Sequence, residues 1–583
     1  MIHRRDLLRR LPLVVGLLVA RRPPLALTSE EDLAFRHGVA SGDPTTDRVV
    51  LWTRISGSEA GDDVAVRWRI ASDPDLRQVV TQGDTRASAE ADWTIHVDVG
   101  GLGPAATWWY DFEALGQRSP TGRTRTAPAT DDARELRLGV VSCASYAAGY
   151  FAAYRHLAER DLDLVVHLGD VIYETDAGAR VRPHDPPTEP VTLADYRRRH
   201  AQYHTDPDLQ VLLQRVALAA VWDDHEVASN AWEGGADGHR PATQGPWEQR
   251  RAAALRAYLE WTPLRRPDPA APERIWRSLP LGANGELVLL DTRHDGRDRQ
   301  VGPYLADPAA ALADPDRRIM SDAQERWLAE RLRTVPGAWR ILANQVVLSP
   351  LLYELPPTLG QVAKPLGMVV AGAVMNPDQW DGYPAAQRRL LEAMAGDDVG
   401  PVVVLTGDIH SSWAFDVPAR AEPGGPSVAV ELVTPSVTSA TFAQIVGPDS
   451  DLVARGLTTV VQDQLSHVRW TEIQRHGYVV VGVSPERVQA DWWHLDGVDS
   501  PTGNEYHAAS WTVVAGDPQL RSAAGPLATR PLPAPLPAPS PAPGSRSDGD
   551  DTFALPRPLQ VGGAVALTVG GGLLALRRRR RRR

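Results

Sequence analysis

The stretch "RLGVVSCASY" (residues 137–146) ends an apolar run at Cys143, the only cysteine among the 583 residues. A free cysteine is often no more than a small buried hydrophobic residue, so the thiol alone indicates no chemistry. A single cysteine also excludes an intramolecular disulfide framework. The position directly after an apolar run is typical of the carboxyl end of a buried strand, so the ends of the other strands become informative.

Apolar segments like the one before Cys143 recur along the middle of the chain, with helical patterns between them. This alternation predicts an α/β fold. The predicted strands are residues 136–142, 162–170, 216–224, 286–292, 339–345 and 401–408.

Chemically reactive side chains follow several of these strands at the point where each strand ends. Ligands of open α/β sheets bind beyond the carboxyl ends of the strands, so these side chains should share one rim. Carboxylates that crowd together repel one another unless a cation neutralises them, and the pattern therefore predicts a polynuclear metal site. The side chains are Cys143, Asp170, Tyr173, Asp223, Asp224, His225, Asn344, Gln345, Asp408 and His410.

The mixture of ligand types indicates which metals such a site would take. Thiolate, phenolate, carboxylate and imidazole ligands together suit a trivalent iron, whereas carboxylates and an amide oxygen suit calcium or manganese. Cys143 would then be a metal ligand that loses its proton to the metal. The structural alternative is that each Gly-Asp or Asp-His pair is an ordinary turn or cap.

Three motifs in chain order, "GDVIYE", "WDDHE" and "GDIHSSW", resemble those of the PhoD-type alkaline phosphatases, which belong to the calcineurin-like and purple-acid-phosphatase superfamily. The stretches "HGVASGDPTTDRVVLWTRI", "ANQVVLS", "NPDQWDGYPAAQRRLL" and "ELVTPSVTS" support this resemblance. It extends from about residue 36 to residue 515, which is most of the chain.

The resemblance implies a four-layer α/β/β/α metallophosphoesterase sandwich, preceded by an all-β domain like those of immunoglobulins or fibronectin. It implies a phosphoric ester hydrolase that releases phosphate from extracellular mono- or diesters by attack of a metal-bound hydroxide. The implied cofactors are one ferric ion and two calcium ions. A phosphodiesterase or phospholipase-D-like specificity on the same fold is the alternative.

The resemblance also implies roles for individual residues. The iron would be held by Cys143, Asp170, Tyr173 and His410, with Cys143 standing where other superfamily members place an aspartate. Asp170 would bridge to a calcium ion whose site Asp224 and Asp408 complete.

Further candidates follow from the same comparison of motifs. The remaining metal ligands would come from Asp223, Asn230 and Asn344. The candidate catalytic residues are His225, His410 and Asp224.

Two residues near these motifs keep open interpretations. Arg293 would either contact phosphate or form a buried ion pair with Asp291. His467, in "LSHVRW", stands near the position of a histidine in related sequences and is a candidate pocket residue.

Two other classes of function compete with the phosphoesterase. A thiol hydrolase would use Cys143 with His167 or His225 and need no metal, but it leaves the aspartates unexplained. A non-enzymatic surface protein would use the β domain on a proline-rich stalk.

Around this α/β region the chain divides by composition. Residues 36–127 read as short alternating strands and predict a β-sandwich domain. The predicted catalytic domain covers residues 136–516, and a Pro/Ala-rich linker that cannot form a core follows at 517–558.

The two ends of the chain predict export and attachment. Residues 1–27 resemble a twin-arginine signal peptide, with Arg4 and Arg5 before a ten-residue apolar stretch. Residues 559–583 combine 18 uncharged residues with seven arginines, which predicts a hydrophobic membrane anchor with a cytoplasmic tail. The motif "LPRP" (555–558) resembles the start of a cell-wall sorting signal but lacks its Thr and Gly. The expected location is therefore extracellular, at the membrane or the wall.

The charge of the chain indicates which partners to expect. The formal charge of −11 becomes −23 for residues 28–576 once the six arginines and one aspartate of residues 1–27 and the seven C-terminal arginines are set aside. So acidic a body binds nucleic acid poorly, and the expected partners are phosphate esters.

Overall fold

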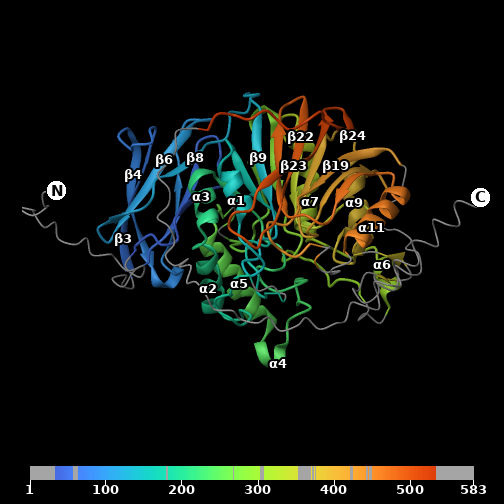
Figure 1. Cartoon of the computed structure of the whole chain (residues 1–583), viewed down its shortest axis with the longest axis horizontal. Coiled ribbons are helices and arrows are strands. Elements are labelled where there is room, and N and C mark those ends of the chain that lie inside the picture. The colour runs from blue at the N-terminus through green and yellow to red at the C-terminus, as the bar shows by residue number, and fades with distance from the viewer. Residues whose placement is uncertain are drawn as a thin grey trace, which may run out of the picture.

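The computed structural model describes residues 33–532 with gaps at 57–62, 177, 179–180, 267, 269, 303–306, 352–368, 371–372, 375, 421–424, 442–443 and 445–449. The predicted signal peptide (1–27), the C-terminal anchor (559–583) and most of the predicted linker lie outside the described residues. Two large sheets packed face to face form the centre of the molecule (Figure 1).

The first sheet has ten strands, and its central strands run parallel. Short apolar segments form these strands because both of their faces are covered. In spatial order the strands are β24 (Asp517–Ser522), β23 (Glu505–Val514), β22 (Arg487–Leu495), β21 (Gly477–Val483), β9 (Leu136–Val141), β10 (Leu164–His167), β11 (Leu218–Ala220), β1 (Val39–Gly42), β2 (Val49–Arg54) and β5 (Thr94–Val99).

The second sheet has seven strands, with four parallel strands, β13, β14, β17 and β19, in sequence at its centre. In spatial order the strands are β12 (Arg277–Pro280), β13 (Gly285–Leu289), β14 (Trp339–Asn344), β17 (Val402–Thr406), β19 (Ser427–Val433), β18 (Ser412–Pro418) and β20 (Val468–Glu472). The six strands predicted for the α/β region are thus all present, as β9, β10, β11, β13, β14 and β17.

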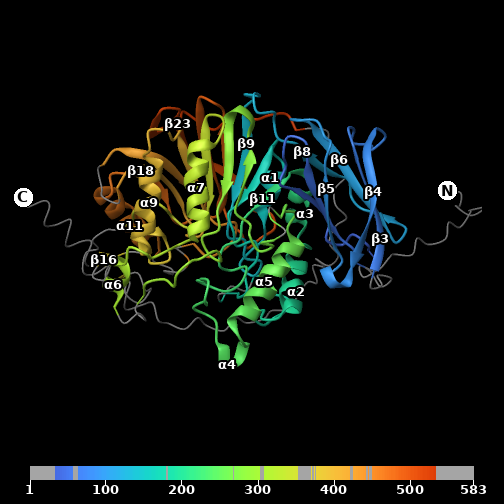
Figure 2. The same cartoon turned by 180° about the vertical axis from the view of Figure 1, so that it is seen from behind.

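Helices cover the outer faces of both sheets and complete a four-layer α/β/β/α sandwich (Figures 1 and 2). Helices α1, α2, α3 and α5 lie beside the first sheet, and α7 and α9 cover the second. The helices are α1 (Ala152–Ala158), α2 (Leu193–Tyr203), α3 (Pro207–Arg215), α4 (Pro241–Gln244), α5 (Trp247–Trp261), α6 (Pro308–Ala313), α7 (Asp322–Thr334), α9 (Pro384–Met394) and α11 (Ser450–Gln464).

Two hydrophobic cores lie on opposite sides of the second sheet. Because side chains alternate along a strand, Ile341 and Ala343 of β14 enter the core between the sheets. Leu342, between them, enters the core under α7 and α9. Because both faces of this sheet are buried, its central strands carry apolar side chains on both faces. The packing on both sides holds the carboxyl ends of these strands in place.

The predicted β-sandwich at the N-terminus is present, but it shares one of its sheets with the α/β region. Its separate sheet consists of β4 (Val79–Ser88), β3 (Asp63–Ala71), β6 (Thr107–Ala114), β7 (Gln117–Arg118) and β8 (Gly122–Arg125). The facing layer is β1, β2 and β5, which extend the ten-stranded sheet, and a third apolar core fills the space between. A small hairpin of β15 (Val369–Val370) and β16 (Ala373–Val374) lies elsewhere in the chain.

The junction between the two regions depends on Gly42 and Asp43. Gly42 pairs with Leu218 of β11, and a Cβ atom at this position would lie 2.0 Å from the carbonyl oxygen of Pro263. Asp43 follows in the left-handed region (φ 45°) and is fully buried. Its carboxylate accepts hydrogen bonds from Arg277 Nε (2.8 Å) and Nη2 (2.6 Å) and from the backbone N–H of Arg265 (2.7 Å).

The C-terminal end of the folded region lies further along the chain than predicted. Residue 516 is a glycine in the turn between β23 and β24 (φ 84°), so the sheet continues past the predicted end of the domain to Ser522. The reason is that the polar strand β24 covers only an edge and lacks an apolar pattern. In the part of the chain that the structure describes, no helix is long and apolar enough to cross a membrane.

Breaking the buried pair at the junction should destabilise the protein strongly. We expect Asp43→Ala to lower the free energy of unfolding by about 3–5 kcal/mol, because it leaves the Arg277 guanidinium buried and unpaired. Urea denaturation measures this change. Asp84→Ala is the matched control, since Asp84 pairs with Arg67 at the surface, and it should leave the stability close to wild type. Equal effects of the two variants would contradict the role given to Asp43.

Candidate metal centre

The predicted site residues come together at the carboxyl ends of the parallel strands of both sheets. Cys143 follows β9, Asp170 follows β10, and Asp223 follows β11 in the first sheet. Asp408 and His410 follow β17 in the second sheet. The two sheets therefore contribute opposite walls of one site.

Four of these residues have an unusual backbone conformation. Cys143, Asp170, Asp408 and His410 all lie in the left-handed region, with φ of 61°, 56°, 62° and 51°. Residues other than glycine adopt it at a cost, and such strain concentrates at functional sites. Here it turns each chain sharply at the strand end, so that the side chain points along the rim.

The strand-end loops of the two sheets also approach each other closely. Gly407 precedes Asp408, and a Cβ atom at residue 407 would lie 2.4 Å from Ser142 Oγ. Any other residue at 407 would push the β17 loop away from the β9 loop that carries Cys143.

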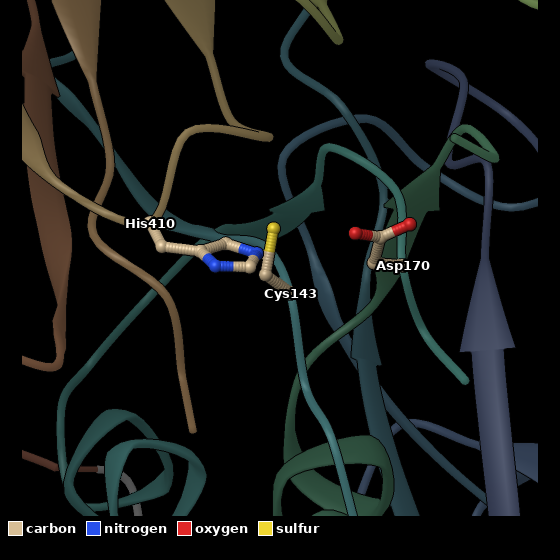
Figure 3. Close-up of side chains that lie close together, drawn as sticks. All are labelled: Cys143, Asp170 and His410. Carbon is tan, nitrogen blue, oxygen red and sulfur yellow. The ribbon is translucent and has the colours of Figure 1, made fainter. Parts of the chain in front are cut away.

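Cys143, Asp170 and His410 form the first cluster of possible ligands (Figure 3). Their sulfur, oxygen and nitrogen atoms all lie within 4.8 Å of one another. Tyr173 joins them, because its hydroxyl donates to Asp170 Oδ2 (2.8 Å) and lies 3.1 Å from His410 Nε2. His410 Nδ1 donates to the carbonyl oxygen of Ala440 (2.8 Å), which leaves Nε2 facing the cluster.

Two further clusters continue from the first. Asp170, Asp224 and His225 form one, and Asp223, Asp224 and Asp408 form the other. Because Asp170 and Asp224 each belong to two clusters, the three make a single continuous site. Asp223 Oδ2 and Asp224 Oδ1 are buried and have no hydrogen-bond partner among the described residues.

Burial opposes the charged forms of most groups in this site. It raises the pKa of Asp170 to about 7 and that of Asp408 to about 6, and neighbouring carboxylates add to both shifts. Burial and the Asp170 carboxylate likewise raise the pKa of Cys143 well above its usual value. At Asp224 the burial is outweighed by Arg293 and His225, so its pKa falls to about 2. Bound cations would restore the ionised forms.

The neighbours of His225 favour its protonated form. Its Nδ1 donates to Glu174 Oε2 at 2.6 Å, and its ring stacks on Tyr173 with the centroids 4.1 Å apart. Burial lowers the pKa of His225, but Glu174, Asp224 and Asp170 together raise it well above the ordinary value. Nε2, on the other side of the ring, lies 3.9 Å from Asp224 Oδ2.

Some predicted residues make their main contacts outside the three clusters. The side-chain amide of Asn230 donates to Asp237 (3.0 Å), although its backbone N–H bonds to Asp224. The side chain of Asn344 donates to the carbonyl of Val346.

Two other histidines that the sequence analysis named as candidates, His467 and His167, also lie apart from the clusters. His467 bonds to the carbonyl of Pro350 at 2.8 Å. His167 bonds to the hydroxyl of Tyr154 at 2.9 Å and not to the thiol of Cys143.

The prediction of an ion pair between the side chains of Arg293 and Asp291 is wrong. Asp291 accepts the backbone N–H of Arg293 at 3.0 Å, whereas the guanidinium reaches Asp223, Asp378 and Asp408. The reason is the turn after β13, which directs the Arg293 side chain into the acidic site.

Two segments of the sequence match family models. Residues 138–492 match the model of the PhoD-like phosphatases, and residues 21–128 match the N-terminal domain of the PhoD-like phosphatases. The chain belongs to the PhoD-like phosphatase family. This PhoD-like phosphatase is therefore a phosphoric ester hydrolase.

Individual relatives agree with the family models. The PhoD-like phosphatase is 32% identical to alkaline phosphatase D of Bacillus subtilis (strain 168) over 483 residues, which are 80% of this chain and 78% of that protein. A solved structure described as "Structure of PhoD" matches with a TM-score of 0.74 and 30% identity, over 85% of this chain and 93% of that one.

Two glutamates of the PhoD-like phosphatase were missed as parts of the site. Glu226 accepts three backbone N–H groups, from Asp170 (3.1 Å), Val171 (2.6 Å) and Asp223 (2.8 Å). Glu174 accepts the backbone N–H of Ser229 (2.7 Å) besides bonding to His225. Glu226 is the last residue of the motif "WDDHE" and Glu174 is the last residue of "GDVIYE", so the sequence did contain a signal for both.

Glu226 should be needed as an acceptor at both of its oxygens: burial and Asp170 raise its pKa to about 8, and the three backbone N–H donors oppose that rise. We expect Glu226→Gln to lower the free energy of unfolding by about 1–3 kcal/mol, because an NH₂ group would face a backbone donor at one of its two oxygen positions. Activity should fall with it, since the amide can accept at only one of the two oxygen positions that hold the loops after β10 and β11. Denaturation and hydrolysis of p-nitrophenyl phosphate measure the two effects.

The exposed Glu233 provides a matched control. Glu233→Gln makes the same chemical change and should resemble wild type in both assays. Wild-type behaviour of Glu226→Gln would refute the role assigned to Glu226.

Proposed function

We propose that this PhoD-like phosphatase is a metal-dependent phosphoesterase that holds one ferric and two calcium ions and releases phosphate from phosphate mono- or diesters. The observation that carries the proposal is the continuous site of three ligand clusters joined through Asp170 and Asp224. The proposed substrates include both phosphate monoesters and phosphate diesters.

The residues present fit these metals. A thiol, a phenol, an imidazole and a carboxylate from Cys143, Tyr173, His410 and Asp170 match the preferences of ferric iron. Carboxylates from Asp170, Asp224 and Asp408 match those of calcium. Asp223 Oδ2 supports the assignment, because a buried carboxylate oxygen without a hydrogen-bond partner among the described residues is costly.

The supporting roles in this proposal fall to residues of the chain itself. The chemistry supplied by bound metal ions is activation of a water molecule and neutralisation of phosphate charge. Glu174, Asp224 and Asp170 raise the pKa of His225, and its protonated form would carry a proton on Nε2 that can pass to the departing ester oxygen. Glu174 fixes the orientation of that ring through Nδ1, and Tyr173 holds its face. His410 has no proton to offer at Nε2 and acts as a ligand.

The geometry disfavours the metal-free thiol hydrolase. Cys143 is 1% exposed, and its Sγ lies 2.7 Å from Ser142 Oγ. Its raised pKa opposes the thiolate that a cysteine nucleophile needs. His167, the suggested base, is already bonded to Tyr154.

Metal analysis and metal removal test the proposal together. We expect about one iron and about two calcium per chain, and loss of p-nitrophenyl phosphate hydrolysis after treatment with EDTA and an iron chelator. Cys143→Ser should lose the iron, because the softer thiolate ligand is gone, and Asp170→Asn should lose both metals. Elemental analysis of the purified variants measures this.

Asp491→Asn is the matched control for Asp170→Asn. Asp491 is equally buried but bonds to Gln489 and Ser510 on β22 and β23, away from the clusters, so the metal content should not change. Full activity of a metal-free protein would rule out the metal-dependent mechanism. Iron retained in Cys143→Ser would remove the thiol from the ligand set.

We further propose that the enzyme is exported folded by a twin-arginine pathway and attached at the cell surface through residues 559–583. The sequence patterns at the two ends support this. An exported enzyme would act on extracellular phosphate esters, and its acidic body argues against nucleic-acid binding.

Cell fractionation of expressed protein tests the location. Replacing both Arg4 and Arg5 by lysine should leave the protein inside the cell, because the arginine pair is what the export machinery reads. The same change at Arg9 and Arg10 is the matched control and should not block export. A chain that ends at residue 558 should appear in the medium. Export of the Arg4/Arg5 variant, or membrane retention of the shortened chain, would contradict the respective proposal.

A further inference from the structure

Arg293 donates from each of its three nitrogens to a different carboxylate. Nε reaches Asp223 Oδ1, Nη1 donates to Asp378 Oδ1 (2.8 Å) and Nη2 donates to Asp408 Oδ1 (2.7 Å). Nη2 also lies 3.4 Å from Asp224 Oδ1. Only a planar guanidinium can serve three acceptors in this way, because the single nitrogen of a lysine cannot reach them all.

This arginine connects the two sheets across the acidic site. Asp223 follows β11 of the first sheet, and Asp408 follows β17 of the second. The guanidinium between them brings the two carboxylates to one cation and fixes how far apart they lie.

Asp378 holds the arginine from behind. Its Oδ1 also accepts from Arg297 Nη2 and Gln300 Nε2, both at 2.7 Å. Asp378 belongs to none of the three ligand clusters, so its carboxylate serves the arginines. The next residue, Gln379, donates to Asp408 Oδ2 at 2.6 Å, which fixes the second oxygen of that carboxylate.

We propose that Arg293 is a positioning residue of the phosphatase: anchored by Asp378, it sets the separation of Asp223 and Asp408 and neutralises one side of the acidic site. Where it concerns bound metals, the inference rests on the proposed function. It implies that Asp223 anchors Arg293 through Oδ1, while Oδ2, which has no hydrogen-bond partner among the described residues, is the oxygen that would bind a metal. The site thus keeps its shape before any metal enters.

A direct contact between Arg293 and the substrate phosphate is the competing interpretation. The side chain is 0% exposed, and each of its nitrogens already has a carboxylate partner. Phosphate could approach only by displacing one of these carboxylates. The two interpretations predict different kinetics, since loss of a phosphate contact raises KM and loss of positioning lowers kcat.

Arg293→Lys keeps the positive charge but cannot donate to all three carboxylates at once. We expect its kcat for p-nitrophenyl phosphate to fall about 100-fold, because misplacement by about 1 Å is enough for such a loss, while KM and inhibition by inorganic phosphate change less than about threefold. Asp378→Asn keeps Arg293 but weakens its anchor, so kcat should fall in the same direction by a smaller factor. This second variant keeps the test decisive if Arg293→Lys does not fold.

Thermal unfolding with and without metal provides a readout that does not depend on activity. In the metal-stripped protein Arg293 is the main counter-charge for Asp223 and Asp408, so Arg293→Lys should lower the unfolding midpoint more there than in the metal-loaded protein. Arg340→Lys is the matched control, because Arg340 is also buried but donates to the backbone carbonyls of Leu332, Val335 and Gly337. It should lower both midpoints equally and leave kcat unchanged.

Each outcome has one meaning. A kcat of Arg293→Lys within twofold of wild type, or a KM and a phosphate inhibition constant raised tenfold at unchanged kcat, overturns the positioning role. Wild-type kinetics of Asp378→Asn overturn the anchor. Wild-type activity that survives complete metal removal refutes the proposed metal dependence instead, and the kinetic comparison with Arg340→Lys still stands in that case.

Discussion

The structure of the site depends on how the mutual repulsion of its acidic groups is compensated. Asp170, Asp223 and Asp224 are at most 3% exposed, and Asp408, whose side chain is 15% exposed, lies close to Asp223 and Asp224 at the carboxyl ends of the strands. In such surroundings like charges raise one another's pKa and would be protonated without compensation. The chain supplies compensating groups of its own, Arg293 and His225, whose protonated form its neighbours favour; Arg293 lies beside Oδ1 of Asp224 and His225 beside Oδ2. The rest of the negative charge is left for ions from outside.

The scaffold around the site explains how so strained an arrangement persists. Every ligand-bearing turn follows a strand that is buried on both faces, so the backbone before it cannot shift. The positive φ angles at Cys143, Asp170, Asp408 and His410 are then imposed by the packed sheets. Glu226 adds a second constraint, because it binds the backbone N–H groups after β10 and β11 at once. Rigid strands and shared acceptors together place the side chains before any ligand binds.

The gathering of the candidate ligands at the strand ends could be predicted from the sequence because each signal is local. An apolar run followed by Asp170 or Asp408 specifies both the strand and the position of its end. The partners of Arg293 could not be predicted in this way, since its three carboxylates lie 70, 85 and 115 residues away. The sheet shared through Gly42 and Leu218 was missed for the same reason, because one pairing between distant strands leaves no periodic pattern. Glu174 and Glu226 lay inside recognised motifs, but their role is to accept backbone donors, and nothing in a side-chain pattern shows that.

The use of a thiol at position 143 follows from the charge balance of the site. An aspartate there would add a further buried negative charge to four existing carboxylates, and folding would have to overcome that repulsion before any metal arrived. Burial and the neighbouring Asp170 raise the pKa of Cys143, so without metal the group stays neutral and adds no repulsion. A metal ligand must be deprotonated, so in the proposed iron site the thiol would acquire its charge only together with the cation that compensates it. Negative charge at this position would thus accompany metal binding, whereas at Asp224 Arg293 and His225 lower the pKa to about 2 and favour the charged form without metal.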